Sequence, residues 1–112
     1  MQYALLFYAE PGLAESLSAE DLADAQAEYA ELVEDGRFRD CARLLPPESA
    51  TSVRRSGGRT LLTDGPFADT EEVLGGVCLV EAADLDEALD LAARAPLLRL
   101  GGTVEIRPVV RS

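Results

Sequence analysis

Hydrophobic and polar positions change their spacing along the chain, and these changes predict an ordered set of strands and helices. Residues 3 to 9 form a short apolar run with aromatic side chains, which is typical of a central strand buried on both faces. After a loop at residues 10 to 17, apolar side chains recur at helical spacing as far as Gly36. Ser18 is placed to cap this helix, and the glycine favours its end.

Five further strands and one further helix follow this segment. The sequence Ser-Gly-Gly at residues 56 to 58 predicts that two of the strands form a hairpin. Asp84 and Glu87 have the spacing of a capping box at the start of the second helix, and Pro96 ends it. The expected strands are residues 37 to 45, 51 to 55, 59 to 63, 73 to 81 and 103 to 109.

This order of elements, β-α-β-(β-β)-β-α-β, predicts an α+β fold. It fits the ferredoxin-like split β-α-β plan with an inserted β-hairpin. At 112 residues, the chain is expected to form one domain, residues 1 to 112. Two helices can cover only one face of the sheet, yet several strands are apolar on both faces. Because monomers rarely expose large apolar patches, we expect a homodimer in which sheet packs against sheet.

The chain is strongly acidic, with 21 acidic against 10 basic residues and a formal net charge of −11. This charge opposes direct binding to nucleic-acid phosphates and to anionic membranes. Histidine, the commonest general base and transition-metal ligand, is absent from the sequence. With no phosphate loop or dinucleotide fingerprint either, we predict neither a metal site nor a cofactor.

Cys41 and Cys78 are the two cysteines, and they lie in separate expected strands without metal-ligand spacing. We interpret them as reduced, buried thiols of a cytoplasmic protein. The N-terminal apolar run has no basic segment before it and stops after Ala9, so we expect no signal peptide. No stretch of the sequence is long enough to cross a membrane as an apolar helix.

Residues 60 to 72 carry the most informative local motif. An apolar run stops at Asp64, and Gly65 and Pro66 then predict a sharp exit from the strand. Phe67 follows directly, which places a large apolar ring in an expected loop. A carboxylate, a tight turn and an aromatic ring in so few residues can form the wall of a ligand pocket.

Several motifs together resemble the YCII-related family, in its DGPF-domain type, over nearly the whole chain. They are Thr63-Asp64-Gly65-Pro66-Phe67-Ala68, Pro46-Pro47-Glu48-Ser49-Ala50-Thr51, Leu74-Gly75-Gly76, Asp84-Leu85-Asp86-Glu87-Ala88-Leu89 and Val104-Glu105-Ile106-Arg107-Pro108. The resemblance implies a dimeric α+β barrel. A few relatives are enzymes, and most have no established reaction. It also implies a link to an extracytoplasmic-function sigma factor, because such members are often encoded beside one.

The chain departs from the family pattern in two ways. The usual Glu-Thr-Lys-Glu after the motif is Asp69-Thr70-Glu71-Glu72 here, so an acid replaces the usual lysine. Some relatives carry a histidine that is proposed to pair with an aspartate. This chain has no histidine, so a His-Asp pair cannot operate in it.

Asp64 is the candidate catalytic residue, and three interpretations of it stay open. It can be a general base, a ligand contact or an anchor of the turn. Gly65 and Pro66 shape the turn and are candidate contacts to a ligand. Phe67 is either a plug of the core or a platform for a ligand.

Two candidates come from other strands. Tyr8 can point its hydroxyl group into the same cleft, or it can be a buried tyrosine with one hydrogen bond. Arg107 alternates with Val104 and Ile106, so it can face a cavity between subunits and bind a carboxylate there. Its other interpretation is a surface charge beside acidic residues.

Two functions fit this sequence. The first is binding of a small carboxylate- or carbonyl-containing ligand in a cleft beside Asp64 to Phe67, with isomerase-like or lyase-like proton transfer as an extension. The second is a non-catalytic regulatory or interaction module, partnered with a sigma factor. The absence of histidine favours the second function, and a defined polar cavity would favour the first.

Overall fold

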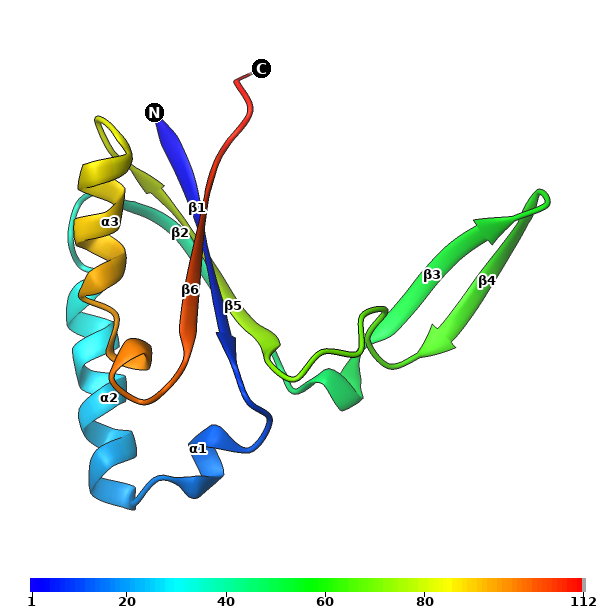
Figure 1. Ribbon diagram of the computed structural model, residues 1–112, viewed down its shortest axis with the longest axis horizontal. Helices are drawn as coiled ribbons and strands as arrows, with labels where there is room; N and C mark the ends of the chain where they lie inside the picture. Colours follow the sequence, from blue (N-terminus) through cyan, green and yellow to red (C-terminus); the bar gives the residue numbers. More distant parts are fainter. Residues whose placement is uncertain (112) are drawn as a thin grey trace.

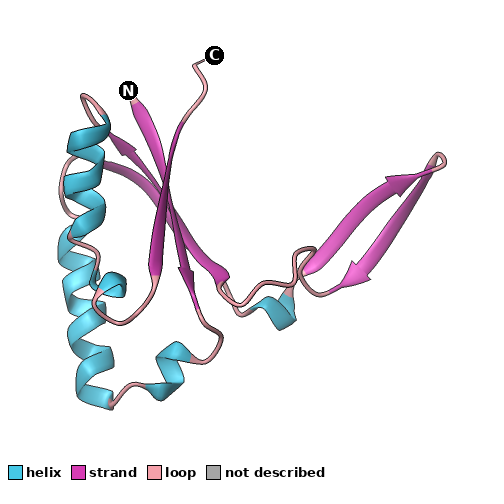
Figure 2. Ribbon diagram, in the orientation of Figure 1, coloured by secondary structure: helices cyan, strands magenta, loops and turns pink. Residues whose placement is uncertain are grey.

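The computed structural model describes residues 1–111, which form a four-stranded sheet, helices on one face of it and a separate two-stranded hairpin (Figures 1 and 2). The elements are β1 (Gln2–Ala9), α1 (Leu13–Ser16), α2 (Ala19–Leu32), β2 (Phe38–Arg43), η1 (Pro47–Ser49), β3 (Thr51–Ser56), β4 (Arg59–Asp64), β5 (Val73–Glu81), α3 (Leu85–Ala93), η2 (Pro96–Leu98) and β6 (Thr103–Pro108). The helix α1 lies where a loop was expected. It is a single turn, too short to show a helical period.

The strand order of the main sheet is β2-β5-β1-β6, and all neighbouring strands are antiparallel. The hairpin β3–β4 is inserted between β2 and β5 and forms its own two-stranded sheet. Without this insertion, the chain follows the β-α-β-β-α-β plan. The prediction of an α+β, ferredoxin-like fold with an inserted hairpin is therefore confirmed, while the dimeric barrel stays a prediction.

The core lies between the main sheet and the helices α2 and α3, which pack on the same face of the sheet (Figure 1). Alternate residues of the central strands point into this core, because successive side chains of a strand face opposite sides. The buried side chains include Tyr3, Leu5 and Phe7 of β1, Cys78 and Val80 of β5, and Leu32, Ala88 and Leu91 of the helices. The opposite sheet face carries no helix and holds half-buried side chains such as Leu6 and Leu79.

Both long helices begin with the expected caps. The Ser18 hydroxyl accepts a hydrogen bond from the Asp21 amide at 3.0 Å, and the Asp84 carboxylate accepts one from the Glu87 amide at 2.9 Å. Only half of the capping box forms at α3, because the Glu87 side chain contacts Arg37 at 3.3 Å instead. Within residues 1–111, no helix is both long and apolar enough to span a membrane.

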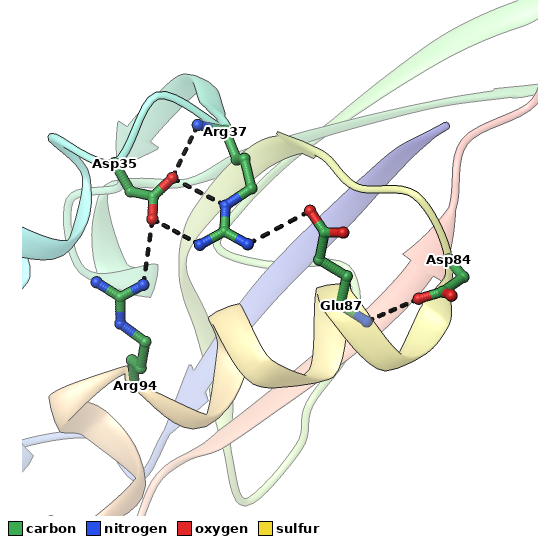
Figure 3. A network of polar contacts seen from close by, with 5 residues as sticks. All are labelled: Asp35, Arg37, Asp84, Glu87 and Arg94. Atoms are coloured by element: carbon green, nitrogen blue, oxygen red, sulfur yellow. Dashed lines mark hydrogen bonds and ion pairs between the residues drawn. The ribbon is translucent and has the colours of Figure 1, made fainter.

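An ion-pair network ties the end of α2 to the start of β2 and to α3 (Figure 3). Arg37 donates to both oxygens of Asp35, at 3.0 Å from Nε and 2.8 Å from a terminal nitrogen. Arg94 adds a contact of 3.2 Å to the same carboxylate. These cations, together with the Arg37 backbone amide, hold the pKa of Asp35 well below its ordinary value. The network therefore fixes the turn that sends the chain from α2 into the sheet.

The prediction of two reduced thiols is wrong for this structure, because Cys41 and Cys78 form a disulfide. The two residues are register partners in the β2–β5 ladder, and both pack against the core. They are 37 positions apart in sequence, so only the antiparallel pairing of two distant strands brings them together. Disulfides are typical of oxidising compartments, and the cysteines therefore no longer support a cytoplasmic location.

Candidate functional site

The β3–β4 hairpin, which we call the arm (residues 51–64), projects away from the helices (Figure 1). Its two-residue loop, Gly57 and Gly58, has φ values of 55° and 76°. Two consecutive positive φ values are typical of the tight hairpin turns that favour glycine. The expected hairpin is thus confirmed, and each strand is one residue longer than predicted.

The motif of residues 64 to 67 lies at the root of the arm. Gly65 has a φ of 101° and donates its amide to the Ala50 carbonyl at 2.7 Å, while its own carbonyl accepts from the Ser52 hydroxyl at 2.8 Å. One backbone bond and one serine side chain therefore hold this turn. The Asp64 side chain is exposed and receives no hydrogen bond from residues 1–111, so these bonds do not support its interpretation as a turn anchor.

Phe67 is 73 % exposed, so its interpretation as a plug of the core is wrong for the single protomer. The Arg54 guanidinium lies 5.2 Å from the centre of its ring, within the range of a cation–π contact. The Phe67 ring therefore contacts Arg54 of the arm and is not buried in the core. Phe67 and Arg54 are both exposed, so a molecule that binds the arm can contact them.

A cavity of about 520 Å³, the motif-side cavity, lies next to this root. It brings together Tyr8 of β1 and Pro66 of the motif, with Leu45, Val73 and Leu74 among its walls. Asp64, Gly65, Phe67 and Arg107 do not line it. Of the candidate site residues, only Tyr8 and Pro66 thus share one cavity.

Arg107 lies on the same uncovered sheet face as Tyr8, but farther along the strands. In the β1–β6 ladder, Arg107 pairs with Ala4 and Thr103 pairs with Tyr8. Four residues of strand separate these positions, or roughly 13 Å. Arg107 therefore does not share the motif-side cavity with Tyr8 within one protomer.

A second cavity, of about 580 Å³, extends between the sheet and α2, and we call it the helix-side cavity. It adjoins the motif-side cavity, because both are lined by Leu44, Leu45, Pro46, Pro47, Val73 and Leu74. Its walls come from β1, α2, the segment of residues 10–17 that contains α1, the end of β2 with the segment up to η1, the start of β5 and the segment around η2. These walls are mostly apolar. Leu22, Ala25, Leu74 and Leu97 are among them. Volumes of 300–1,000 Å³ with mostly apolar walls are usual for small-molecule sites.

Glycine at position 76 leaves room in this cavity. Gly76 is buried beside Phe7, and a Cβ atom there would meet the Ala42 carbonyl oxygen at 3.3 Å and the Phe7 ring at 3.9 Å. Its register partner in β2 is Arg43, whose side chain lines the same cavity. A larger residue at position 76 would therefore fill space beside the arginine.

Few polar side chains line the helix-side cavity, and the half-buried Tyr29 and the exposed Gln26 and Arg43 are the candidates for holding a ligand. Burial raises the pKa of the Tyr29 phenol above 10.0, and the positive charge of Arg43 opposes this rise. The same hydroxyl lies 3.4 Å from the Cys78 sulfur. A half-buried neutral phenol and the cation of the exposed Arg43 thus line a mostly apolar space.

Three carboxylates, those of Glu10, Glu15 and Glu48, also line the helix-side cavity, and all three residues are exposed. Their negative charge disfavours ligands with several anionic groups. The cavity therefore suits a neutral molecule or one with a single carboxylate, which the arginine can bind through two parallel hydrogen bonds.

Sequence reasoning missed Arg43, although one signal pointed to it. Arg43 stands two positions after Cys41 in the same strand, so both side chains lie on the face covered by helices. Arg43 is exposed at the end of β2, and it is among the residues that line the cavity. Within residues 1–111, no group of three histidine, cysteine, aspartate or glutamate side chains is placed to hold a metal ion.

Comparison with known proteins identifies a family that matches the chain over its length. The family model of the YCII-related domain matches residues 1–112. An uncharacterized protein of Rhizobium meliloti (strain 1021) is 38 % identical over 114 residues, which cover 97 % of this chain and 92 % of that protein. The chain belongs to the family of YCII-related proteins.

Proposed function

We propose that the protein binds a small, mostly apolar molecule carrying one carboxylate or carbonyl group in the helix-side cavity. The observation that carries this proposal is the meeting of Arg43 and Tyr29 in an apolar cavity beside Gly76. The arginine binds the ligand oxygens, and the neutral phenol donates its one proton to the ligand in place of the Cys78 sulfur. The exposed glutamates oppose phosphorylated ligands.

Ligand binding by Arg43→Gln tests this proposal. A thermal-shift screen of small carboxylates, lactones and ketones identifies a ligand, and calorimetry then gives its affinity. We expect the variant to bind at least tenfold more weakly, which corresponds to about 1.4 kcal/mol. Arg39→Gln is the matched control, because Arg39 lies in the same strand, outside the cavity, and bonds only the Gly36 carbonyl. Equal affinity in both variants would refute the role of Arg43.

The protein also forms a two-fold dimer through the sheet face that carries no helix. The half-buried apolar side chains of this face support the proposal, because monomers rarely leave such a face in water. Light scattering at micromolar concentration should give twice the chain mass of 12.0 kDa. A monomer at that concentration would remove the barrel and any cavity between subunits.

Asp64 acts as a general base or ligand contact only if the ligand extends beyond the motif-side cavity to the exposed carboxylate, or if a partner subunit closes over the motif. Asp64→Asn keeps the size of the side chain and removes its charge. If the residue contacts the ligand, affinity falls by tenfold or more and the midpoint of thermal unfolding stays the same. A loss of stability alone, of about 0.5–2 kcal/mol as for a capping residue, would instead indicate a structural role.

The alternative function is a non-catalytic regulatory or interaction module, with an extracytoplasmic-function sigma factor as its partner. The projecting arm with exposed Phe67 supports an interaction role. Co-purification of the protein with an extracytoplasmic-function sigma factor tests this alternative. A cytoplasmic location is part of the same proposal. Cell fractionation decides it, and the disulfide counts against it.

A further inference from the structure

We propose that the β3–β4 arm is an exchange arm, which packs on the partner protomer in a two-fold dimer. This inference rests on the dimer proposed above and adds the contact that the arm makes in it. The arm consists of residues 51–64, and its root carries the motif of residues 64 to 67.

The protomer is too extended and too exposed for its mass. Its radius of gyration is 15.9 Å, whereas a compact domain of this length has about 13 Å. Its accessible surface is 7820 Å², against about 6,000 Å² for a compact monomer of this mass. The excess of roughly 1,800 Å² is larger than the roughly 800 Å² that one partner buries in a standard interface.

The arm contributes to this excess because it has no core of its own. Val53 and Leu62 are register partners on one face of the arm, and they are 64 % and 71 % exposed. Leu61, on the other face, is 49 % exposed. An isolated two-stranded hairpin is only marginally stable in water. An arm with these side chains therefore needs a surface to pack on.

Charge identifies the second copy of this chain as that surface. The arm carries three arginines and one aspartate, which give it a net charge of +2. Because the whole chain has a net charge of −11, the residues outside the arm have a net charge of −13. Arg54, Arg55 and Arg59 take part in no ion pair within residues 1–111. A basic arm on an acidic body is complementary to the body of another copy. A nucleic acid would be repelled by the same body.

The placement of the arm fits exchange across a two-fold axis. It leaves the body on the side of the sheet opposite the helices, which is the side of the uncovered face (Figure 1). Strands of six residues extend about 20 Å, and a sheet of four strands is about 19 Å wide. A partner bound to the uncovered face therefore lies within reach of the arm.

Two variants, studied by light scattering across a dilution series, test the exchange. Leu62→Glu replaces an apolar contact of the arm with a negative charge, and we expect it to weaken dimerisation at least tenfold. Leu89→Glu is the matched control, because Leu89 is 47 % exposed on α3, far from the arm, and we expect it to dimerise like the unchanged protein. Equal dimerisation by both variants would overturn the exchange.

Photo-cross-linking locates the arm directly. A benzophenone amino acid replaces Thr60, an exposed residue near the tip of the arm, in the purified full-length protein. We expect a cross-linked product of twice the chain mass, with the link in the main sheet of the partner. A dimer without this product refutes the exchange and leaves the dimer proposal standing. A monomer in light scattering refutes both.

Discussion

Cys41 and Cys78 face each other across the β2–β5 ladder and are joined by a disulfide. Titration of the denatured, unreduced protein should therefore find no reactive thiol. Removing the bond through Cys41→Ser and Cys78→Ser together should lower the free energy of unfolding by about 2–4 kcal/mol, because the unfolded chain loses a loop constraint. Reduction of the unchanged protein should lower it similarly. Two reactive thiols in the first titration would contradict the structure.

The Asp35 network predicts a loss of stability at acid pH. Hydrogen bonds from Arg37 and Arg94 lower the pKa of this carboxylate below its ordinary 3.8, so the folded protein keeps it ionised where the unfolded chain binds a proton. Its contribution to the free energy of unfolding is fully present above about pH 4 and declines as the pH falls below that. Asp35→Asn should unfold with a weaker dependence on pH in this range.

Substitution of Arg37 or of Arg94 shows which of the two arginines stabilises the Asp35 carboxylate more. The Arg37 side chain is the largest cause of the lowered pKa of Asp35, ahead of Arg94. Denaturant unfolding from pH 5 to pH 2 should therefore show a larger loss of acid-dependent stability for Arg37→Gln than for Arg94→Gln. The reverse order would mean that the contact shown in Figure 3 between Asp35 and Arg37 does not persist in solution.

Tyr29 offers a measurement of the helix-side cavity that needs no ligand. Burial raises the pKa of its phenol, and Arg43 opposes the rise. Arg43→Gln should therefore move the titration of Tyr29 to higher pH, as followed by tyrosinate absorbance after subtraction of a Tyr29→Phe background. Arg39→Gln should leave this titration in place. If the titration of Tyr29 is unchanged in Arg43→Gln, the two side chains do not lie close together in solution, which contradicts the ligand proposal.

The raised pKa of Tyr29 also predicts that the free energy of unfolding falls at alkaline pH. The folded protein retains the phenolic proton after the unfolded chain begins to lose it near pH 10.0. The contribution of this residue is therefore complete below that pH and is lost as the pH rises through the folded pKa. Tyr29→Phe should lose less stability than the unchanged protein above pH 10 in denaturant titrations.

Gly102 marks a close approach between the segment after η2 and strand β1. A Cβ atom at this position would lie 2.8 Å from the Tyr8 carbonyl oxygen and would also collide with Leu97. Gly102→Ala should reduce the free energy of unfolding by about 1–3 kcal/mol, the usual cost of overpacking. Gly36→Ala is the control, because an added Cβ atom there has no neighbour within 4 Å. Thermal unfolding of both variants checks the difference.

Local signals in the sequence predicted the local parts of the fold. Strand β5 has the predicted bounds, Val73–Glu81, because a continuous apolar run ends at charged and polar residues. Ser18 and Asp84 both cap helices as predicted, since a cap depends on residues within one turn. The hairpin turn at Gly57 and Gly58 follows from the same kind of short-range chemistry.

Features that depend on contacts between distant strands were not predictable in this way. The disulfide requires Cys41 and Cys78 to share a register that no local pattern specifies. Arg43 reaches the helix-side cavity only because β2 occupies the edge next to β5. Phe67 was expected either in the core or at a ligand, and it stacks on Arg54 at the root of a projecting arm instead.

The disulfide also makes the arm part of a covalent ring. Residues 41 to 78 are closed by the bond between the sulfur atoms, and the whole arm lies inside this loop. If trypsin cuts once, after Arg59 at the tip, the two fragments stay joined in non-reducing electrophoresis and separate only after reductant is added. The chain can therefore be opened at Gly57 and Gly58, or can carry a reporter peptide there, while the molecule remains in one covalent piece.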